Sequence, residues 1–455
     1  MDTIEYTDVP RTKIPDLLSL RNVWQQRLIV WAALADAQAG LGLISSEAAR
    51  AIRDAAIIER LDLTRVEAGV HRLNHPLMAL LIEFRAVVGE HGQHVHVGAT
   101  TDNIVRTADS LVLRQIHGEI LELLAAAFEA MAKLAEESKD MLCAARTHRQ
   151  HGVPMTFGLK VAGWIAEFED HIERLAEIEP RAFTVMMGGA VGHYGSWGAM
   201  GPQIQAEVAD LLDLYPARVP SRAIIGVGKA EYLNILGLIA ATCFRVFQEL
   251  ETLMGTEYGE VCEPIRPNAI GSSIMPQKVN PTLADRGMSL AAQLNNLTSL
   301  GTASIMTQVH EVSNVGTRLS SAGLTQGTEL AGEMLSVLVT LLSGLRLFPK
   351  RMRTNLDLTG GLISAADVTS ALEGHIGLPK AHGILHEIAQ KVQAGEGSFA
   401  RLLASDSRIE SYLTPDDITR LLDPAAHVGL SVEMSEEAAV TAHRLAANIR
   451  RQQAV

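Results

Sequence analysis

Four polar side chains in the stretch 271–281 could act on an anion. The stretch reads Gly-Ser-Ser-Ile-Met-Pro-Gln-Lys-Val-Asn-Pro. Its glycine permits a tight turn, and its two prolines stiffen the chain without offering helix or strand hydrogen bonds. Hydroxyl and amide groups can hydrogen-bond a carboxylate while an ammonium group supplies positive charge. A polar surface loop is the plainer alternative, but the length and order of the stretch favour an anion-binding loop with Ser272, Ser273, Lys278 and Asn280.

A histidine in the stretch 145–158 is placed for proton transfer. The stretch reads Ala-Arg-Thr-His-Arg-Gln-His-Gly-Val-Pro-Met-Thr-Phe-Gly. His148 stands shortly before a glycine and a proline that should break the chain, and a helix is expected to follow, so its side chain can face a cleft. An imidazole that titrates near neutrality is a suitable proton donor to a leaving amine or alcohol. A single histidine is more often structural, so the surrounding block must decide.

Histidines crowd into residues 71–96 and raise the question of a metal site. His71 and His75 are four residues apart, and on a helix they would share one face as zinc ligands do. No suitably placed glutamate follows His71, and the cysteines lie elsewhere in the chain. We therefore predict no metal and no organic cofactor; a metal-dependent hydrolase is the alternative, which metal analysis would test. His91 and His94 are expected to be solvated or held in a turn.

Composition narrows the class of protein. The 455 residues are 47% hydrophobic but only 4% aromatic, so alanine and leucine fill the interior, as helical packing prefers. The net charge of -13 argues against nucleic acid as a partner. The first residues lack the blocks of a signal peptide, and no apolar run is expected to approach the roughly 20 residues that span a bilayer. Three cysteines are too few for a disulfide framework, which favours the cytoplasm.

Hydrophobic periodicity predicts three helical domains. Residues 1–98 read as an N-terminal helical domain, residues 99–348 as a central domain of long helices, and residues 349–455 as a C-terminal helical domain. Apolar residues of the central domain recur at spacings of three and four, as in a helix bundle. These stripes are Leu233, Leu236, Ala240, Phe244 and Phe247, and Met334, Val337, Leu341, Leu345 and Phe348. The run 235–241 is apolar nearly all round, so we expect neighbouring subunits to cover it.

These blocks resemble the fumarase/aspartase superfamily, lyases that eliminate a group beside a carboxylate and usually release fumarate. Residues 271–281 resemble its signature loop, and residues 145–158 resemble its second common region. The resemblance extends over essentially the whole chain, and it is closest to the adenylosuccinate lyase and 3-carboxy-cis,cis-muconate cycloisomerase branches. It implies an all-α, three-domain fold with a central long-helix bundle. It also implies a homotetramer whose active sites combine residues from three chains.

The resemblance implies roles for individual residues. Ser272, ionised, would take the proton from carbon, and His148 would be the general acid. Asp285 would brace His148 at a position where the family usually carries a glutamate. A larger set is expected to bind a dicarboxylate substrate. Arg106 and Arg149 belong to it because they depart from the family pattern. The full set is His75, His96, Thr100, Thr101, Asn103, Arg106, Thr147, Arg149, Gln150, Ser273, Met275, Lys278 and Asn280.

The departures from both branches concern charge. Where those branches carry Arg-Asp-Arg, this chain has Gly226-Val227-Gly228, and where they carry His-Glu-Arg, it has His310-Glu311-Val312. Such arginines help adenylosuccinate lyase to grip its nucleotide, because phosphate suits a guanidinium fork. An AMP-bearing substrate is therefore not expected. The additional arginines at 106 and 149 could bind substrate, or they could form surface or interhelical pairs.

The expected reaction is anti elimination from a succinyl-type substrate, with cleavage of a C–N bond to give fumarate. The relocated positive charge favours a small polar or anionic leaving group, such as nitrite from nitrosuccinate, beside amino or N-substituted succinates. Adenylosuccinate lyase or the cycloisomerase itself is one alternative. A non-catalytic structural member of the fold is the other. No nucleic acid or membrane partner is expected.

Overall fold

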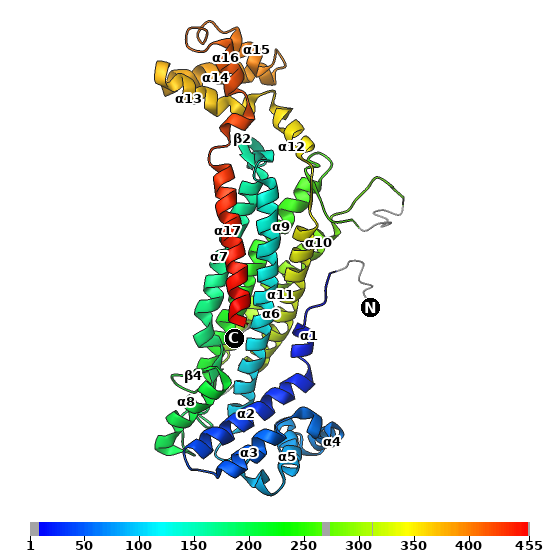
Figure 1. The fold of residues 1–455 in the computed structure, drawn as a ribbon, viewed down its shortest axis with the longest axis vertical. Coiled ribbons are helices and arrows are strands. Elements are labelled where there is room, and N and C mark those ends of the chain that lie inside the picture. The colour runs from blue at the N-terminus through cyan, green and yellow to red at the C-terminus, as the bar shows by residue number, and fades with distance from the viewer. Residues whose placement is uncertain (1–8, 266–273, 312, 454–455) are drawn as a thin grey trace.

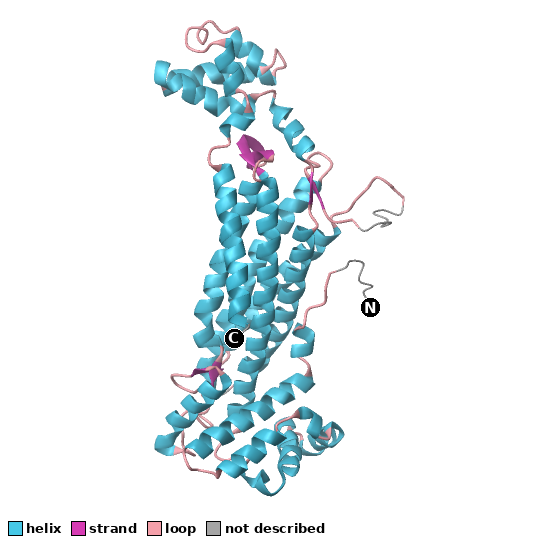
Figure 2. Cartoon of the chain, viewed as in Figure 1, coloured by secondary structure: helices cyan, strands magenta, loops and turns pink. Residues whose placement is uncertain are grey.

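The protein is mainly α-helical, which confirms the predicted fold class. The computed structural model describes residues 9–265, 274–311 and 313–453. Within these residues, long helices lie side by side along the molecule (Figure 1). The strands in this described part of the chain form three two-stranded sheets, which are small additions at the helix ends (Figure 2).

Short helices form the N-terminal part of the chain. Ser19 begins α2 and Ser45 begins α3, because each hydroxyl accepts a hydrogen bond from a backbone N–H three residues later. The elements are α1 Ile14–Leu17, α2 Leu20–Gly40, α3 Ser46–Ala55, η1 Ile58–Arg60, α4 Leu63–Leu73, α5 Pro76–Val88 and η2 Gly89–His94.

The histidine-rich segment does not form one continuous helix. Asn74 has a left-handed backbone, with φ of 49°, and ends α4 between His71 and His75. The two imidazoles therefore lie on different helices, not on a shared face. His91 and His94 lie in the η2 turn. Across the residues that the structure describes, no group of three or more His, Cys, Asp or Glu side chains could hold a metal ion.

Long helices form a bundle that runs the length of the molecule (Figure 1). They are α6 Thr101–Ser138, α7 Phe157–Ala182, α9 Arg222–Met254, α10 Thr282–Met306, α11 Asn314–Ser343 and α17 Ser431–Gln453. At 1.5 Å per residue, the 38 residues of α6 span about 57 Å. In the view of Figure 1 the chain runs upward along α6, α9 and α11 and downward along α7 and α10.

The predicted stripes lie in the core of this bundle. On α9, Leu233, Leu236, Ala240 and Phe247 are at most 1% exposed, and Phe244 is partly buried against the same core. On α11, Met334, Val337 and Leu341 are 0% exposed. That helix ends at Ser343, so the last two members of its stripe lie beyond it. Between the long helices lie η3 Gly198–Met200, α8 Gly201–Leu212, the parallel pair β3 Thr184–Val185 and β4 Tyr215–Pro216, and the antiparallel pair β5 Val261–Cys262 and β6 Arg346–Leu347.

The C-terminal region occupies two places. Residues 362–422 build a separate apolar core at one end of the molecule, whereas α17 returns to pack against α6 and α7. Thr414 begins α16 through a capping box with Asp417. The division of the chain into domains near residues 98 and 348 remains a proposal. Helix α17 belongs to the third of these domains by sequence, but it lies beside the bundle. The elements are α12 Pro349–Leu356, η4 Asp357–Thr359, η5 Leu362–Ser364, α13 Ala365–Ile376, α14 Leu378–Gln393, α15 Phe399–Ala404, α16 Pro415–Leu421 and η6 Pro424–His427.

The stretch 145–158 differs from its prediction. It forms the end of β1 Leu142–Thr147, all of the antiparallel strand β2 Gln150–Thr156, and the start of α7. Gly152 and Pro154 lie inside β2, so they do not break the chain before a helix. A two-stranded ribbon tolerates this proline because each of its strands has a free edge.

Helix α9 corrects the expectation about apolar runs. Its segment Gly226–Met254 is 29 residues long, and by length and composition alone it could cross a membrane, with a hydropathy of 1.3. The expectation that no run approaches this length is therefore wrong. Within the structure 67% of the apolar window is buried. A core helix passes the same test, because both kinds of helix are long and apolar.

Gly228 brings α9 into close contact with the end of α7. A Cβ atom at this position would lie 2.0 Å from the carbonyl oxygen of Arg181 and 2.5 Å from its carbon. Both are backbone atoms, so a side chain requires one helix to shift. An added Cβ at Gly226 would meet no described atom within 4 Å. The helix contact thus explains why no arginine occupies position 228.

We predict opposite effects for two alanine substitutions on α9. Gly228→Ala should lower the free energy of unfolding by about 1–3 kcal/mol, because overpacking forces the backbone apart. Gly226→Ala should leave it unchanged or raise it by up to about 1 kcal/mol, because alanine is the better helix former. Thermal and denaturant unfolding of both variants measure this difference. Equal stability of the two variants would contradict the close contact at 228.

Candidate active site

His148 and Arg149 form the turn of the β1–β2 hairpin. Thr147 pairs with Gln150 across the strands, and the two turn residues have φ of 51° and 65°. Positive φ at both central positions favours Asn-Gly, and each residue with a larger side chain costs roughly 1–2 kcal/mol there. All four residues 147–150 are exposed. The strained, exposed turn is a reason to assign function to its side chains.

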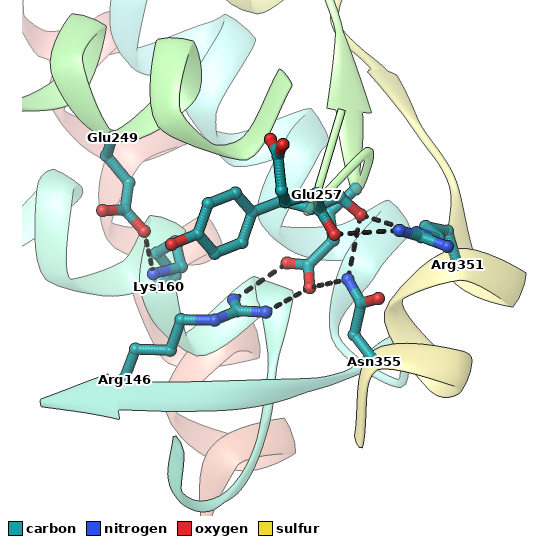
Figure 3. A network of polar contacts seen from close by, with 8 residues as sticks. Arg146, Lys160, Glu249, Glu257, Arg351 and Asn355 are labelled. Carbon is teal, nitrogen blue, oxygen red and sulfur yellow. Dashed lines mark hydrogen bonds and ion pairs between the residues drawn. The ribbon is translucent and has the colours of Figure 1, made fainter. Parts of the chain in front are cut away.

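A buried carboxylate anchors this hairpin close to its turn, through Arg146 (Figure 3). Glu260 is 1% exposed and accepts two hydrogen bonds from the Arg146 guanidinium, one of them 3.1 Å from Nη1 to Oε2. The Asn355 amide donates to the same carboxylate at 2.6 Å and to the Tyr258 carbonyl at 2.9 Å. Arg351 also donates to the Tyr258 carbonyl, at 2.8 Å. These contacts join β1, the segment before β5, and α12.

A second buried carboxylate joins the two ends of the signature loop. Glu263 precedes the loop, and its oxygens accept hydrogen bonds from the backbone N–H groups of Ala284 at 2.7 Å and Leu283 at 2.9 Å. These groups open α10, whose N-cap residue Pro281 provides no side-chain cap. A carboxylate suits the positive end of a helix. Burial raises the pKa of Glu263, its backbone N–H donors oppose the rise, and the Asp285 carboxylate adds to it.

The signature loop is described only in its second half. Ser272 and Ser273 lie outside the described residues. Met275, Lys278 and Asn280 are exposed, and the backbone N–H of Lys278 donates to the carbonyl of Met275 at 3.0 Å.

Asp285 is exposed in the first turn of α10. In the described part of one chain its side chain makes no hydrogen bond or ion pair with His148. Its bracing role therefore stays a prediction.

A pocket of about 510 Å³ lies beside the hairpin, between α7 and α9. Arg146 and Arg149 border it from the hairpin. Three of the cationic side chains that line this pocket are paired with carboxylates, as Arg146–Glu260, Lys160–Glu249 and Arg245–Glu167. Within the described ranges Arg149 makes no hydrogen bond or ion pair. Arg149 is thus a lining cation that is available to an external anion.

The predicted residues at the start of α6 differ in their surroundings. The backbone N–H of Thr100 donates to Asn103 Oδ1 at 2.8 Å in a capping box. The Asn103 amide donates to the carbonyl oxygens of Met186 at 3.0 Å and Gly189 at 3.4 Å. Asn103 is 0% exposed, so its polar atoms serve the fold of this chain, whereas Thr101 is partly exposed. The substrate-binding roles of all three remain predictions.

Arg106 is paired within its own helix. Its guanidinium lies 2.9 Å from Asp109 Oδ2 and 3.6 Å from Asp102 Oδ1. The pairs favour the ion-pair alternative for this arginine.

Its neighbour Lys229 was not identified from the sequence, where it is one lysine at the start of an apolar helix. Burial lowers the pKa of Lys229 to about 8, while Asp109 raises it and Arg106 lowers it further.

Both predicted histidines near α6 accept a hydrogen bond at Nδ1. His75 caps α5 by accepting from the backbone N–H of Met78 at 3.3 Å. His96 accepts from the indole N–H of Trp31 at 3.0 Å. Burial lowers the pKa of His96 to about 4, and the Arg85 cation lowers it further. His96 is therefore a neutral imidazole near pH 7.

The predicted site residues fall into two groups at opposite ends of α6 (Figure 1). His75, His96 and Thr100 precede this helix, whereas His148 lies beyond its other end, and Lys278 lies at that same end, beside the start of α10. The separation of about 57 Å far exceeds the reach of any side chain. One chain in this conformation cannot bring both groups to one small substrate.

We predict that Glu263→Gln weakens the base of the signature loop. The glutamine amide places an N–H donor against backbone N–H donors, so at least one hydrogen bond and the negative charge are lost. The free energy of unfolding should fall by about 1–3 kcal/mol. The value of kcat/KM should fall as well, because Lys278 and Asn280 lie in the segment that leads into α10.

Glu257→Gln, an exposed position in the same segment, is the matched control and should change neither quantity. Thermal unfolding and steady-state kinetics measure both variants. Indistinguishable behaviour of the two variants would refute the capping role of Glu263.

Comparison with proteins of known name identifies the family of this chain. The chain matches the family model described as "Lyase" over residues 9–296 and that described as "Adenylosuccinate lyase C-terminus" over residues 361–438. It is 33% identical over 426 residues to the adenylosuccinate lyase of Pyrococcus abyssi, covering 92% of this chain and 94% of that protein. It is 32% identical over 440 residues to the N-acetyl-S-(2-succino)cysteine lyase of Enterococcus italicus, covering 93% of this chain and 96% of that protein.

The fold has a solved counterpart as well. The crystal structure of a fumarate lyase from Mesorhizobium sp. BNC1 superimposes with a TM-score of 0.87 at 28% identity, over 96% of this chain and 99% of that one. The lyase family model covers more than half of the chain. The chain therefore belongs to the lyase family of the fumarase/aspartase superfamily and is an enzyme of that superfamily.

Proposed function

We propose that this enzyme catalyses anti elimination from a succinyl-type substrate, breaking a C–N bond and releasing fumarate. The observation that carries the proposal is the strained turn that exposes His148 and Arg149 beside a pocket rich in cations. Arg149, which has no ion-pair partner among the described residues, offers a cation to a dicarboxylate substrate, and His148 offers a proton donor to a leaving amine. The two sequence relatives are also named for succinyl compounds.

The proposed chemistry starts at the signature loop. Ser272, as an alkoxide, takes the proton from the carbon beside a carboxylate, and the electron pair moves into that carboxylate to give an aci-carboxylate dianion. Lys278 and Asn280 stabilise the developing charge, which is usually the largest catalytic contribution. The dianion then expels the leaving group from the neighbouring carbon to form the double bond of fumarate. His148 protonates an amine as it leaves.

The proposed assembly is a homotetramer with active sites shared between subunits. The separation of the two residue groups along α6 supports sharing, because neighbouring copies can bring the start of one α6 to the hairpin of another. Exposed apolar residues on the central helices support contact between copies, among them Leu238 at 50% exposure and Met306 at 79%. We also propose that the enzyme acts in the cytoplasm and has no nucleic acid or membrane partner.

For the leaving group we favour a small anion, and Arg149 as its ligand in preference to Arg106. Arg149 faces the pocket without a carboxylate partner in the described residues, whereas the charge of Arg106 is balanced by Asp102 and Asp109. Nitrite needs no proton as it leaves, and its oxygens accept hydrogen bonds from arginine. Nitrosuccinate is therefore the substrate that we place first. Adenylosuccinate stays the alternative, and the close helix contact at Gly228 leaves no space for a nucleotide-binding arginine there.

A substrate panel tests this proposal. Purified enzyme should release fumarate, followed by its ultraviolet absorbance, from nitrosuccinate faster than from aspartate, N-substituted succinates or adenylosuccinate. Ser272→Ala should lower this rate by roughly a thousandfold or more while the oligomer stays intact. Efficient release of AMP from adenylosuccinate would overturn the choice of leaving group. Failure with every succinyl compound would point to a non-catalytic member of the fold.

We predict a trade-off between stability and activity for Arg149→Gly. Glycine adopts a φ of 65° without strain, so the free energy of unfolding should rise by roughly 1 kcal/mol. The same change removes the guanidinium, so kcat/KM for the nitro substrate should fall by about tenfold or more. Thermal unfolding and kinetics measure the two effects on one protein. A variant that gains stability and keeps full activity would show that Arg149 does not bind substrate.

A further inference from the structure

A single hydrogen bond orients His96, which lies between η2 and α6. The indole Nε1–H of Trp31 donates to His96 Nδ1 at 3.0 Å, and the two rings meet edge to face at 86°. Trp31 is 1% exposed and stacks on Phe84 with ring centroids 5.6 Å apart. The donor is therefore held rigidly inside the N-terminal helices.

This hydrogen bond fixes the position of the proton on the imidazole. An indole N–H can only donate, so the Nδ1 atom of His96 must present a lone pair. In the neutral ring the proton then resides on Nε2. The guanidinium of Arg85, which donates to the carbonyl of Val95 at 2.7 Å, lies close enough to disfavour a second proton.

The other side of the ring is open. His96 is partly exposed, and its Nε2 atom makes no hydrogen bond to any residue that the structure describes. The ring thus offers one N–H donor of fixed direction, a few residues before the start of α6. Thr100 and Thr101, which begin that helix, provide hydroxyl groups nearby in the chain.

We propose that Trp31 is a positioning residue that holds His96 as a neutral Nε2–H donor for a carboxylate oxygen of the substrate. This inference rests on the proposed function, since it names the group that meets one end of the succinyl unit. A neutral donor stabilises negative charge without surrendering its proton to the aci-carboxylate. The two histidines then have separate tasks: His148 exchanges protons and His96 does not.

Two substitutions of His96 test which nitrogen matters. The amide nitrogen of glutamine can occupy the place of Nε2, whereas that of asparagine lies near Nδ1. His96→Gln should retain fumarate release to within about tenfold, and His96→Asn should lose on the order of 100-fold, as for a lost hydrogen bond to a charged group. Better activity of the asparagine variant would overturn the proposal.

A matched pair of tryptophan variants tests the role of Trp31. Trp31→Phe keeps an aromatic ring but removes the N–H, and it should lower kcat/KM by about fivefold. Trp24→Phe on the same helix is the control, because Trp24 is 3% exposed and its indole N–H has no partner in the described chain. In the His96→Gln background, Trp31→Phe should cause no further loss, because glutamine has no atom equivalent to Nδ1. An equal loss in both backgrounds would mean that Trp31 serves packing alone.

Nitrogen-15 spectra of histidine-labelled protein read the tautomer without any substrate. The signals that vanish in His96→Gln identify His96, and Nε2 should carry the proton in wild type but not uniformly in Trp31→Phe. A proton on Nδ1 in wild type would overturn the inference even if the enzyme releases fumarate. If no succinyl compound is cleaved but the spectra show Nε2–H, succinate binding by calorimetry decides. His96→Asn should then bind more weakly than His96→Gln, and equal binding would refute the donor role.

Discussion

The buried carboxylate of Glu260 fixes the arrangement of the upper end of the bundle. It accepts hydrogen bonds from Arg146 of the hairpin and from Asn355 of α12, and it lies three residues before Glu263, which caps α10. A charge in this position is tolerable only because its partners satisfy it, and removing one partner of a buried pair typically costs about 3–5 kcal/mol. The position of His148 therefore depends on Glu260, and the position of the signature loop depends on Glu263, three residues further along the same segment. The importance of Glu260 is geometric more than energetic, since buried ion pairs contribute little net stability.

The chemistry at this end follows from that arrangement. The hairpin turn keeps His148 and Arg149 in a strained, exposed conformation, and it can do so because Arg146 anchors the strand that leads into the turn. Glu263 performs the equivalent task for the signature loop, whose following helix would otherwise begin uncapped at Pro281. These anchors thus hold the backbone beside the proposed site residues His148, Arg149, Lys278 and Asn280, whose side chains stay exposed.

Much of the fold could be predicted from the sequence, because its signals are local. The apolar stripe of α9 and the caps at Ser45 and Thr414 depend on residues three or four apart. The hairpin was missed because Gly152 and Pro154 usually break the chain, and their tolerance within β2 depends on an unpaired edge that sequence does not show. Glu260 and Glu263 were missed for a related reason: their partners Asn355 and Ala284 are distant in sequence, and an isolated glutamate carries no mark of burial.

The candidate site follows the same division. The residue types of the site were predicted from the blocks 145–158 and 271–281 and from residues 75–106. The separation of residues 75–101 from those two blocks by the length of α6 was not predicted, because it depends on how the assembled bundle orients that helix. The placement of Arg106 beside Asp109 also needed the structure, and it moved the anion-binding role towards Arg149. In the proposed assembly, each active site takes the start of α6 from one chain and the hairpin from another.

Subunit mixing tests this claim most directly. Arg149→Gly and Thr101→Val are to be purified separately, dissociated, mixed and reassembled, and fumarate release from nitrosuccinate is to be compared with that of each parent treated alone. If the two groups come from different chains, mixed oligomers contain some sites with neither substitution, and activity should return to as much as about a quarter of wild type. Mixed oligomers that are demonstrably formed but show only the mean activity of their parents would contradict a shared site.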